Sequence, residues 1–168
     1  MATLSHQRGV SLIELLVAVA ILAALYGAIT IAVDAAGGAR RVEREGLRFA
    51  ALVRIACERA QVSGRDYGIH VARGGYAFSI AGAQAWRLEA GGDLRPRELA
   101  RGMTLALERE GTDAELVEEL PAEPQAACFA SGELTPFAAT LSAGELAPFE
   151  IDAAIDGTVT TRPGEPPA

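Results

Sequence analysis

A carboxylate within an apolar segment is the most informative chemical feature of this 168-residue chain. Glu14 stands near the start of residues 10–33, a run of mainly Leu, Ile, Ala and Val that holds no other charged residue. A charged side chain at the centre of a membrane costs roughly 3 kcal/mol on insertion scales. A residue at such a cost needs a function, and its position favours assembly between helices over catalysis.

The rest of the sequence offers little for an active site. The chain has two histidines, His6 and His70, so it lacks the cluster that zinc requires. It has no G-x-S-x-G, phosphate-binding glycine loop, C-x-x-C or calcium-loop spacing. His70 alternates with Ile69 and Val71, which predicts a strand residue that faces solvent. We therefore predict no catalytic residue, no metal site and no cofactor.

The run that carries Glu14 is long enough to cross a membrane. As a helix, residues 10–33 would extend about 36 Å, against a hydrocarbon core of about 30 Å. A secretory signal peptide is the alternative, and Ala18-Val19-Ala20 fits its cleavage pattern, but its apolar region would be shorter. Arg8 precedes the run and Arg40, Arg41 and Arg44 follow it, so charge alone does not define the orientation.

The sequence G-V-S-L-I-E at Gly9 to Glu14, followed by an apolar helix, resembles the class III signal of type IV pilins and pseudopilins. In that family a membrane-embedded prepilin peptidase cuts after the glycine and methylates the new amino terminus. The resemblance implies that residues 1–9 are a leader, that the cut falls between Gly9 and Val10, and that Val10 is N-methylated. Two departures are that Phe or Met is commoner at the first mature position and that the leader is usually more basic.

The resemblance also implies a role for Glu14, which becomes the fifth mature residue. The amine that cleavage creates on Val10 of one chain can meet Glu14 of its neighbour, offsetting the cost of burying either charge. Such a pair would also fix the axial register between helices. The alternative is a carboxylate that reaches the headgroup level without a partner.

Residues 34–63 continue the helix in amphipathic form. Apolar and small residues recur there at spacings of three and four, which is typical of one buried helix face. They are Val42, Gly46, Phe49, Ala50, Val53, Ala56, Cys57 and Ala60. Gly37-Gly38 should loosen the helix, and the intervening Arg and Glu residues should form surface pairs of little energetic weight.

Residues 64–168 change to a strand pattern, with short alternating runs and glycine turns. Asp66–Ala72 and Tyr76–Ile80 predict a hairpin, and Gln84–Leu88 would extend it to a meander. Further strands are expected at 103–107, 126–130, 137–141, 149–155 and 158–162. Residues 95–101 and 111–124 are expected to be loops, and 163–168 a frayed tail. One long helix followed by short strands predicts an α+β, type IV pilin-like fold with an antiparallel sheet.

A second motif narrows the family. Phe129 to Phe137 reads FASGELTPF and, with one residue fewer between its first Phe and Ser131, is similar to the F-x-x-(S/D)-G-x-x-(T/S)-P-F signature of the H-type minor pseudopilins of type II secretion (GspH/FimT-like). Ser131-Gly132 supports a tight turn, and Pro136 fixes the start of the following strand. Phe129 and Phe137 should pack inward across the turn. We interpret the motif as structural.

Cys57 and Cys128 are the only cysteines. In a periplasmic domain they could form a disulfide between the amphipathic helix and the sheet. The alternative is two buried thiols that behave as small hydrophobic side chains. The sequence does not decide between them.

The resemblance implies a minor pseudopilin without enzymatic activity, at or near the tip of a periplasmic pseudopilus that moves folded proteins across the outer membrane. It would be a single-pass inner-membrane protein with its C-terminal domain in the periplasm. Its partners would be the other minor pseudopilins, the major pseudopilin, the prepilin peptidase and the exported cargo. A net charge of −7 argues against nucleic-acid binding. The alternatives are a minor pilin of a type IV pilus, such as one for DNA uptake, and a membrane-anchored periplasmic enzyme.

Overall fold

The computed structural model describes residues 12–109 and 117–165, without the side chains of residues 27–36. The chain forms two compact units, Met1–Gly37 and Gly38–Ala168, which we describe separately. Their boundary falls between the two glycines that the sequence predicted would loosen the helix. Gly9 and Val10 lie outside the described residues, as does part of the predicted segment 10–33.

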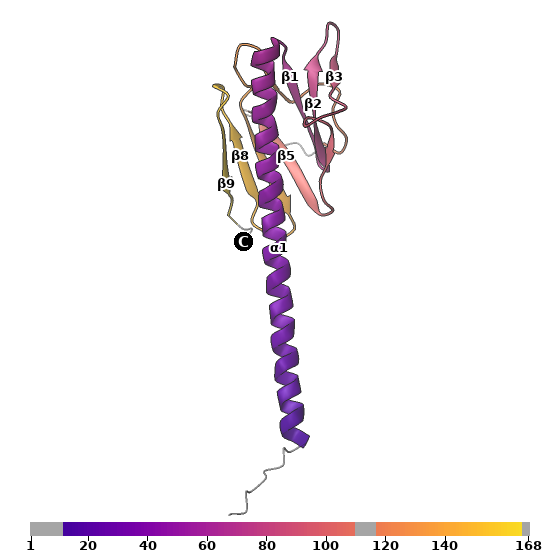
Figure 1. Ribbon diagram of the computed structural model, residues 1–168, viewed down its shortest axis with the longest axis vertical. Helices are drawn as coiled ribbons and strands as arrows, with labels where there is room; N and C mark the ends of the chain where they lie inside the picture. The colour runs from indigo at the N-terminus through magenta and orange to yellow at the C-terminus, as the bar shows by residue number, and fades with distance from the viewer. Residues whose placement is uncertain (1–11, 110–116, 166–168) are drawn as a thin grey trace, which may run out of the picture. The chain divides into compact units, whose positions relative to one another are not determined.

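One helix, α1, covers Leu12–Ser63 (Figure 1). It ends where Gly64 takes a positive φ of 66° and donates its backbone N–H to the carbonyl of Ala60 at 2.9 Å. This left-handed cap is the usual reason for glycine directly after a helix. In the first unit the described side chains, from Leu12 to Tyr26, are all exposed. Within the described residues, no helix is long and apolar enough to qualify as a membrane span.

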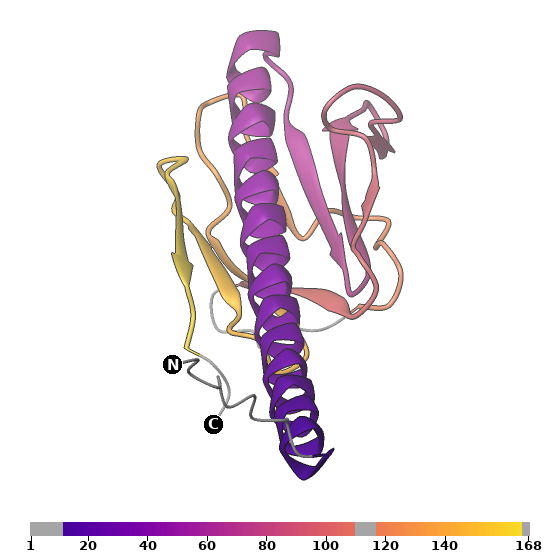
Figure 2. The same cartoon turned by 60° about the horizontal axis from the view of Figure 1, so that its bottom comes forward.

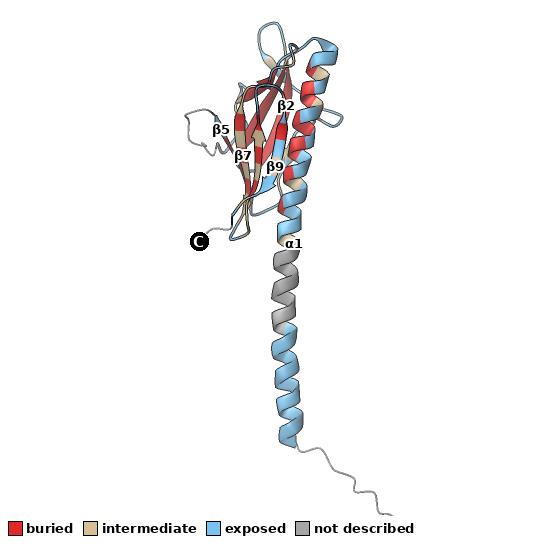
Figure 3. Ribbon diagram, turned by 90° about the vertical axis from the view of Figure 1, so that its left-hand side faces the viewer, coloured by how far each residue is buried: buried red, intermediate tan, exposed pale blue. Residues whose placement is uncertain are grey.

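In the second unit, α1 buries the face that its periodicity predicted. All eight residues expected on that face are buried, and Leu52 joins them. Figure 3 shows these buried positions on the side of the helix that faces the strands. At Gly46 the approach is so close that an added Cβ would collide with the ring of Phe149. The amphipathic helix is therefore confirmed, and glycine at position 46 has a packing role.

Five strands form sheet A, which is antiparallel throughout. They are β1 (Tyr67–Ala72), β2 (Gly75–Ala81), β3 (Trp86–Leu88), β4 (Arg97–Glu98) and β6 (Ala126–Cys128). The order is β3-β2-β1-β6, and β4 also pairs with β2. The predicted meander of β1, β2 and β3 is confirmed. The prediction that residues 95–101 are entirely loop is wrong, because Arg97 and Glu98 pair with Tyr76 and Gly75.

The remaining four strands form sheet B, a separate antiparallel sheet. They are β5 (Met103–Arg109), β7 (Phe137–Ala143), β8 (Phe149–Ala153) and β9 (Val159–Pro163), in the order β5-β7-β8-β9. Buried residues alternate along β7 and β8, as expected for a sheet with one covered face. The α+β class is confirmed, with two sheets where the sequence predicted one.

Both sheets pack on the same helix. In Figures 1 and 2, strands β1, β2 and β3 of sheet A lie to the right of α1 and strands β8 and β9 of sheet B to its left, while β5 of sheet B reaches the right-hand side below sheet A. Phe49 of α1 connects them, because its ring centroid lies 4.9 Å from that of Tyr76 in sheet A and 6.4 Å from that of Phe137 in sheet B. Both contacts are edge-on, a favoured geometry for aromatic pairs. The core of the second unit therefore centres on the helix face at Phe49.

Candidate assembly site and turn motif

Glu14 lies in the first turn of α1, on an exposed apolar surface. Its neighbours Leu12, Ile13, Leu15 and Leu16 are all exposed. A carboxylate in a first turn interacts favourably with the positive end of the helix dipole. Among the described residues Glu14 takes part in no ion pair, so its carboxylate is available to a cation from another chain.

The FASGELTPF segment forms the connection from sheet A to sheet B. Gly132 has a φ of 98° and donates its N–H to the carbonyl of Phe129 at 2.9 Å. Phe129 in turn donates its N–H to the carbonyl of Glu133 at 2.8 Å, and Ser131 lies within this turn. Pro136 then leads directly into β7 at Phe137. The residues of the motif thus shape a tight turn, and Gly132 supplies its left-handed conformation.

The two aromatic residues of this motif point in different directions. Phe137 is buried, as predicted, but Phe129 is 38% exposed, so the prediction that it packs inward is wrong. The preceding residue Cys128 is fully buried in β6. All three residues of β6 are buried, and Phe129 follows the last of them at the start of the turn, where its side chain is partly exposed.

Cys57 of α1 and Cys128 of β6 are joined by a disulfide in the structure. Both residues are buried, and 71 positions separate them in sequence. The bond ties the helix to the strand from which the turn motif starts. The sequence left open whether the two cysteines form a disulfide or remain buried thiols, and in the structure they form a disulfide.

His70 is not a solvent-facing residue, which corrects the prediction. It is 1% exposed, because residues 117–125 cover the face of sheet A opposite α1. One ring nitrogen lies 2.9 Å from the carbonyl oxygen of Pro121, and the other lies 2.7 Å from the hydroxyl of Ser79. Burial lowers the pKa of His70 below its usual 6.5, more than the Pro121 bond and Glu123 raise it. The imidazole is therefore held neutral as part of the structure.

A second polar contact within the core was not predicted. The hydroxyl of Tyr76 donates to a carboxylate oxygen of Glu45 at 2.8 Å, and Arg48 donates to the other oxygen at 2.8 Å. Burial first, and then the Glu45 carboxylate, raise the pKa of Tyr76. The sequence placed Glu45 on the helix and Tyr76 on a strand. It predicted that the Arg and Glu residues of the helix form only exposed ion pairs, so a contact between Glu45 and Tyr76 was not expected.

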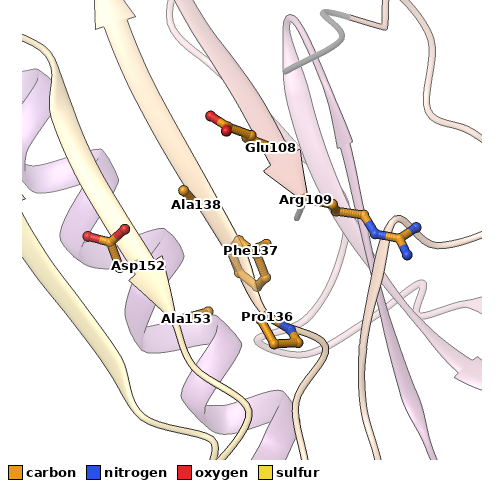
Figure 4. Close-up of a pocket in the computed structure, with 7 residues that line it drawn as sticks. All are labelled: Glu108, Arg109, Pro136, Phe137, Ala138, Asp152 and Ala153. Atoms are coloured by element: carbon orange, nitrogen blue, oxygen red, sulfur yellow. The ribbon is translucent and has the colours of Figure 1, made fainter. Parts of the chain in front are cut away.

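A shallow hollow of about 240 Å³ lies at the start of β7 (Figure 4). Its lining includes Pro136 and Phe137 of the turn motif, with Glu108 and Asp152 on the strands that flank Ala138. Figure 4 shows the two carboxylates on either side of Ala138. Glu108 and Asp152 are two strand spacings apart, which is roughly 10 Å. The residues that line the hollow include no histidine and no Ser, Thr or Cys nucleophile. In the part of the chain that the structure describes, no cluster of His, Cys, Asp and Glu could hold a metal ion.

Comparisons with known proteins agree with these features. Residues 4–30 match the prokaryotic N-terminal methylation motif, and this matched stretch contains Gly9, Val10 and Glu14. Two proteins named "Type II secretion system protein H" are each 28% identical to the chain. The one from Aeromonas hydrophila aligns over 79% of this chain and 79% of its own length. The one from Pseudomonas aeruginosa aligns over 77% and 80%, respectively.

Solved structures show the same fold. The crystal structure of the minor pseudopilin EPSH from the type II secretion system of Vibrio cholerae has a TM-score of 0.62 and 22% identity, covering 77% of this chain and 97% of that protein. The solution structure of Escherichia coli GspH has a TM-score of 0.59 and 20% identity, covering 76% and 91%. In sequence and in fold, the chain therefore resembles the H-type minor pseudopilins of type II secretion, as its two motifs predicted.

Proposed function

We propose that this chain is a structural subunit of a type II secretion pseudopilus, at or near its tip, that supports export of folded proteins across the outer membrane. The observation that carries the proposal is Glu14 within the matched methylation motif, in the first turn of a helix whose exposed surface is otherwise apolar. The similarity to two protein H sequences over most of both lengths supports it. The chain would act by assembly, without enzymatic activity of its own.

The proposal divides the chain by function. Residues 1–9 are a leader that a prepilin peptidase removes, and residues 10–33 are a segment that first anchors the chain in the inner membrane and later packs against other subunits. Residues 34–63 continue the helix, and 64–168 form a periplasmic domain. The methylation motif and the resemblance to pseudopilins support a membrane-anchored periplasmic protein. The partners are other minor pseudopilins, the major pseudopilin and the exported cargo.

Glu14 supplies the specific step in assembly. Cleavage before Val10 gives each subunit a positive amino terminus, and Glu14 of an adjacent subunit can pair with it. In an apolar environment the pair forms well only when the two helices have one axial offset, so the contact sets register. Because Glu14 is exposed in the single chain, the carboxylate can reach a neighbour without a change of fold.

Replacement of Glu14 tests this proposal. In cells that lack their own copy of the chain, Glu14→Ala should be inserted and processed normally, yet reduce secretion of the system's cargo at least about tenfold, because an amine left unpaired in an apolar interface costs roughly 3–5 kcal/mol. Glu89→Ala removes one carboxylate from the second unit and should secrete normally. Wild-type secretion by Glu14→Ala would contradict the assigned role.

A further inference from the structure

We propose that a hollow on the second unit binds the phosphate headgroup of an anionic phospholipid. This arginine hollow, of about 220 Å³, is lined by Arg41, Arg44, Glu45, Arg48, Ala100 and Met103. The proposal rests on the membrane anchoring proposed above and adds a specific lipid contact to it. It concerns residues that neither the methylation motif nor the turn motif includes.

The charges in the arginine hollow favour an anion. Its only carboxylate, Glu45, already accepts hydrogen bonds from the hydroxyl of Tyr76 and from Arg48. Within the described residues, the ion pairs of the chain involve neither Arg41 nor Arg44. Two guanidinium groups thus line the hollow without a counter-charge among those residues. A guanidinium group presents paired donors that match phosphate oxygens.

This concentration of positive charge is local. The whole chain has a net charge of −7, whereas residues 40–48 of α1 hold Arg40, Arg41, Arg44 and Arg48 against Glu43 and Glu45. Arg41, Arg44 and Arg48 are spaced by three and four residues, which places them on one helix face. This arginine face of the helix is separate from the face that is buried at Val42 and Phe49. A general excess of arginine on the surface therefore does not explain the hollow.

Two features favour a lipid over a free anion. Only residues 34–40 separate Arg41 from the end of the apolar run, so an anchored chain holds the hollow near a dense layer of headgroups. Basic residues close to a membrane segment each gain about fivefold in affinity, roughly 1 kcal/mol, from an anionic lipid surface. Ala100 and Met103 also give the hollow an apolar wall, which suits the first carbons of an acyl chain and not a free inorganic anion. Such a contact would retain the subunit at the membrane before assembly.

Lipid retention by the full chain tests the proposal. The chain, purified in micelles that contain equal amounts of phosphatidylglycerol and phosphatidylcholine, is examined by native mass spectrometry. The wild type should retain phosphatidylglycerol over phosphatidylcholine by at least about fivefold. The variant R41Q/R44Q/R48Q should lose most of this preference. The variant R65Q/R87Q/R95Q removes the same charge from exposed sites elsewhere and should keep it.

Three results would overturn the proposal. They are equal retention of both lipids by the wild type, an equal loss of preference in the two triple variants, and a preference that R41Q/R44Q/R48Q keeps. Retention of added inorganic phosphate by a wild type that shows no lipid preference would assign the hollow to a free anion. Circular dichroism of each variant verifies that the fold is retained. Because no assembly or secretion is measured, failure here leaves the proposed function untouched.

Discussion

Cys57 and Cys128 join the face of α1 that packs on the sheets to the strand that precedes the turn motif. The bond closes a long loop, and the entropy of such a loop in the unfolded chain predicts a contribution of about 4 kcal/mol. Replacing both cysteines by alanine should therefore lower the free energy of unfolding by about that amount, measured by urea denaturation followed by circular dichroism.

The matched measurement is the reduced wild type, which keeps both sulfur atoms in the core. It should lose nearly as much stability as Cys57→Ala/Cys128→Ala, because the lost cross-link and not the lost volume dominates. A loss below about 1 kcal/mol in both samples would show that the loop-entropy account does not apply to this domain.

The Tyr76–Glu45 contact gives a second prediction. Tyr76→Phe keeps the ring packing against Phe49 but removes the donor to a carboxylate that is 16% exposed. Loss of a partner by a buried polar group costs about 1–3 kcal/mol, so the free energy of unfolding should fall by that amount. Tyr67→Phe is the control, since the Tyr67 hydroxyl makes no hydrogen bond with the described residues, and it should change stability by less than about 0.5 kcal/mol. Equal effects of the two variants would argue against the contact.

The neutral state of His70 predicts a dependence of stability on pH. Because burial lowers the pKa of His70 below 6.5 in the folded chain, the unfolded chain binds more protons near and below that pH. The neutral imidazole makes its full contribution to the free energy of unfolding above pH 6.5. This contribution is lost as the pH falls from 6.5 towards the pKa of His70 in the folded chain, and below that pKa the stability no longer changes on account of His70. Comparison of wild type with His70→Gln by urea denaturation across this range isolates the effect.

The processed chain also has His70 as its only histidine, so its ring signals can be followed by NMR without ambiguity. The midpoint of that titration should lie below 6.5. A midpoint above 6.5, or a pH profile of stability that His70→Gln leaves unchanged, would contradict the buried, neutral imidazole.

Much of the fold follows from local patterns. The spacing of apolar residues defined the buried face of α1, because a helix that packs on one side must repeat its apolar positions every three to four residues. Glycine turns and alternation similarly located strands in both sheets. Pairing across the chain was less accessible: β4 is only Arg97–Glu98, too short to show alternation, and it exists because β2 offers a partner.

The errors at His70 and Phe129 have different physical sources. Alternation shows that His70 and Ile69 face opposite sides of sheet A, but not that residues 117–125 cover the second side. Phe129 was expected within a strand over residues 126–130, but β6 ends at Cys128, so Phe129 lies in the turn and not in the buried strand. The Tyr76–Glu45 pair joins side chains from distant parts of the sequence, so no local pattern contained it. The arginine hollow is different, because the spacing of Arg41, Arg44 and Arg48 is local and only Ala100 and Met103 come from elsewhere.

The mass of the mature protein, co-expressed with a prepilin peptidase, tests the central claim most directly. The account predicts loss of Met1 to Gly9 and one added methyl group on Val10, and Gly9→Ala should block this processing. An uncut wild-type chain, or a cut after Ala20, would contradict the account, because Glu14 would then have no neighbouring amine to bind.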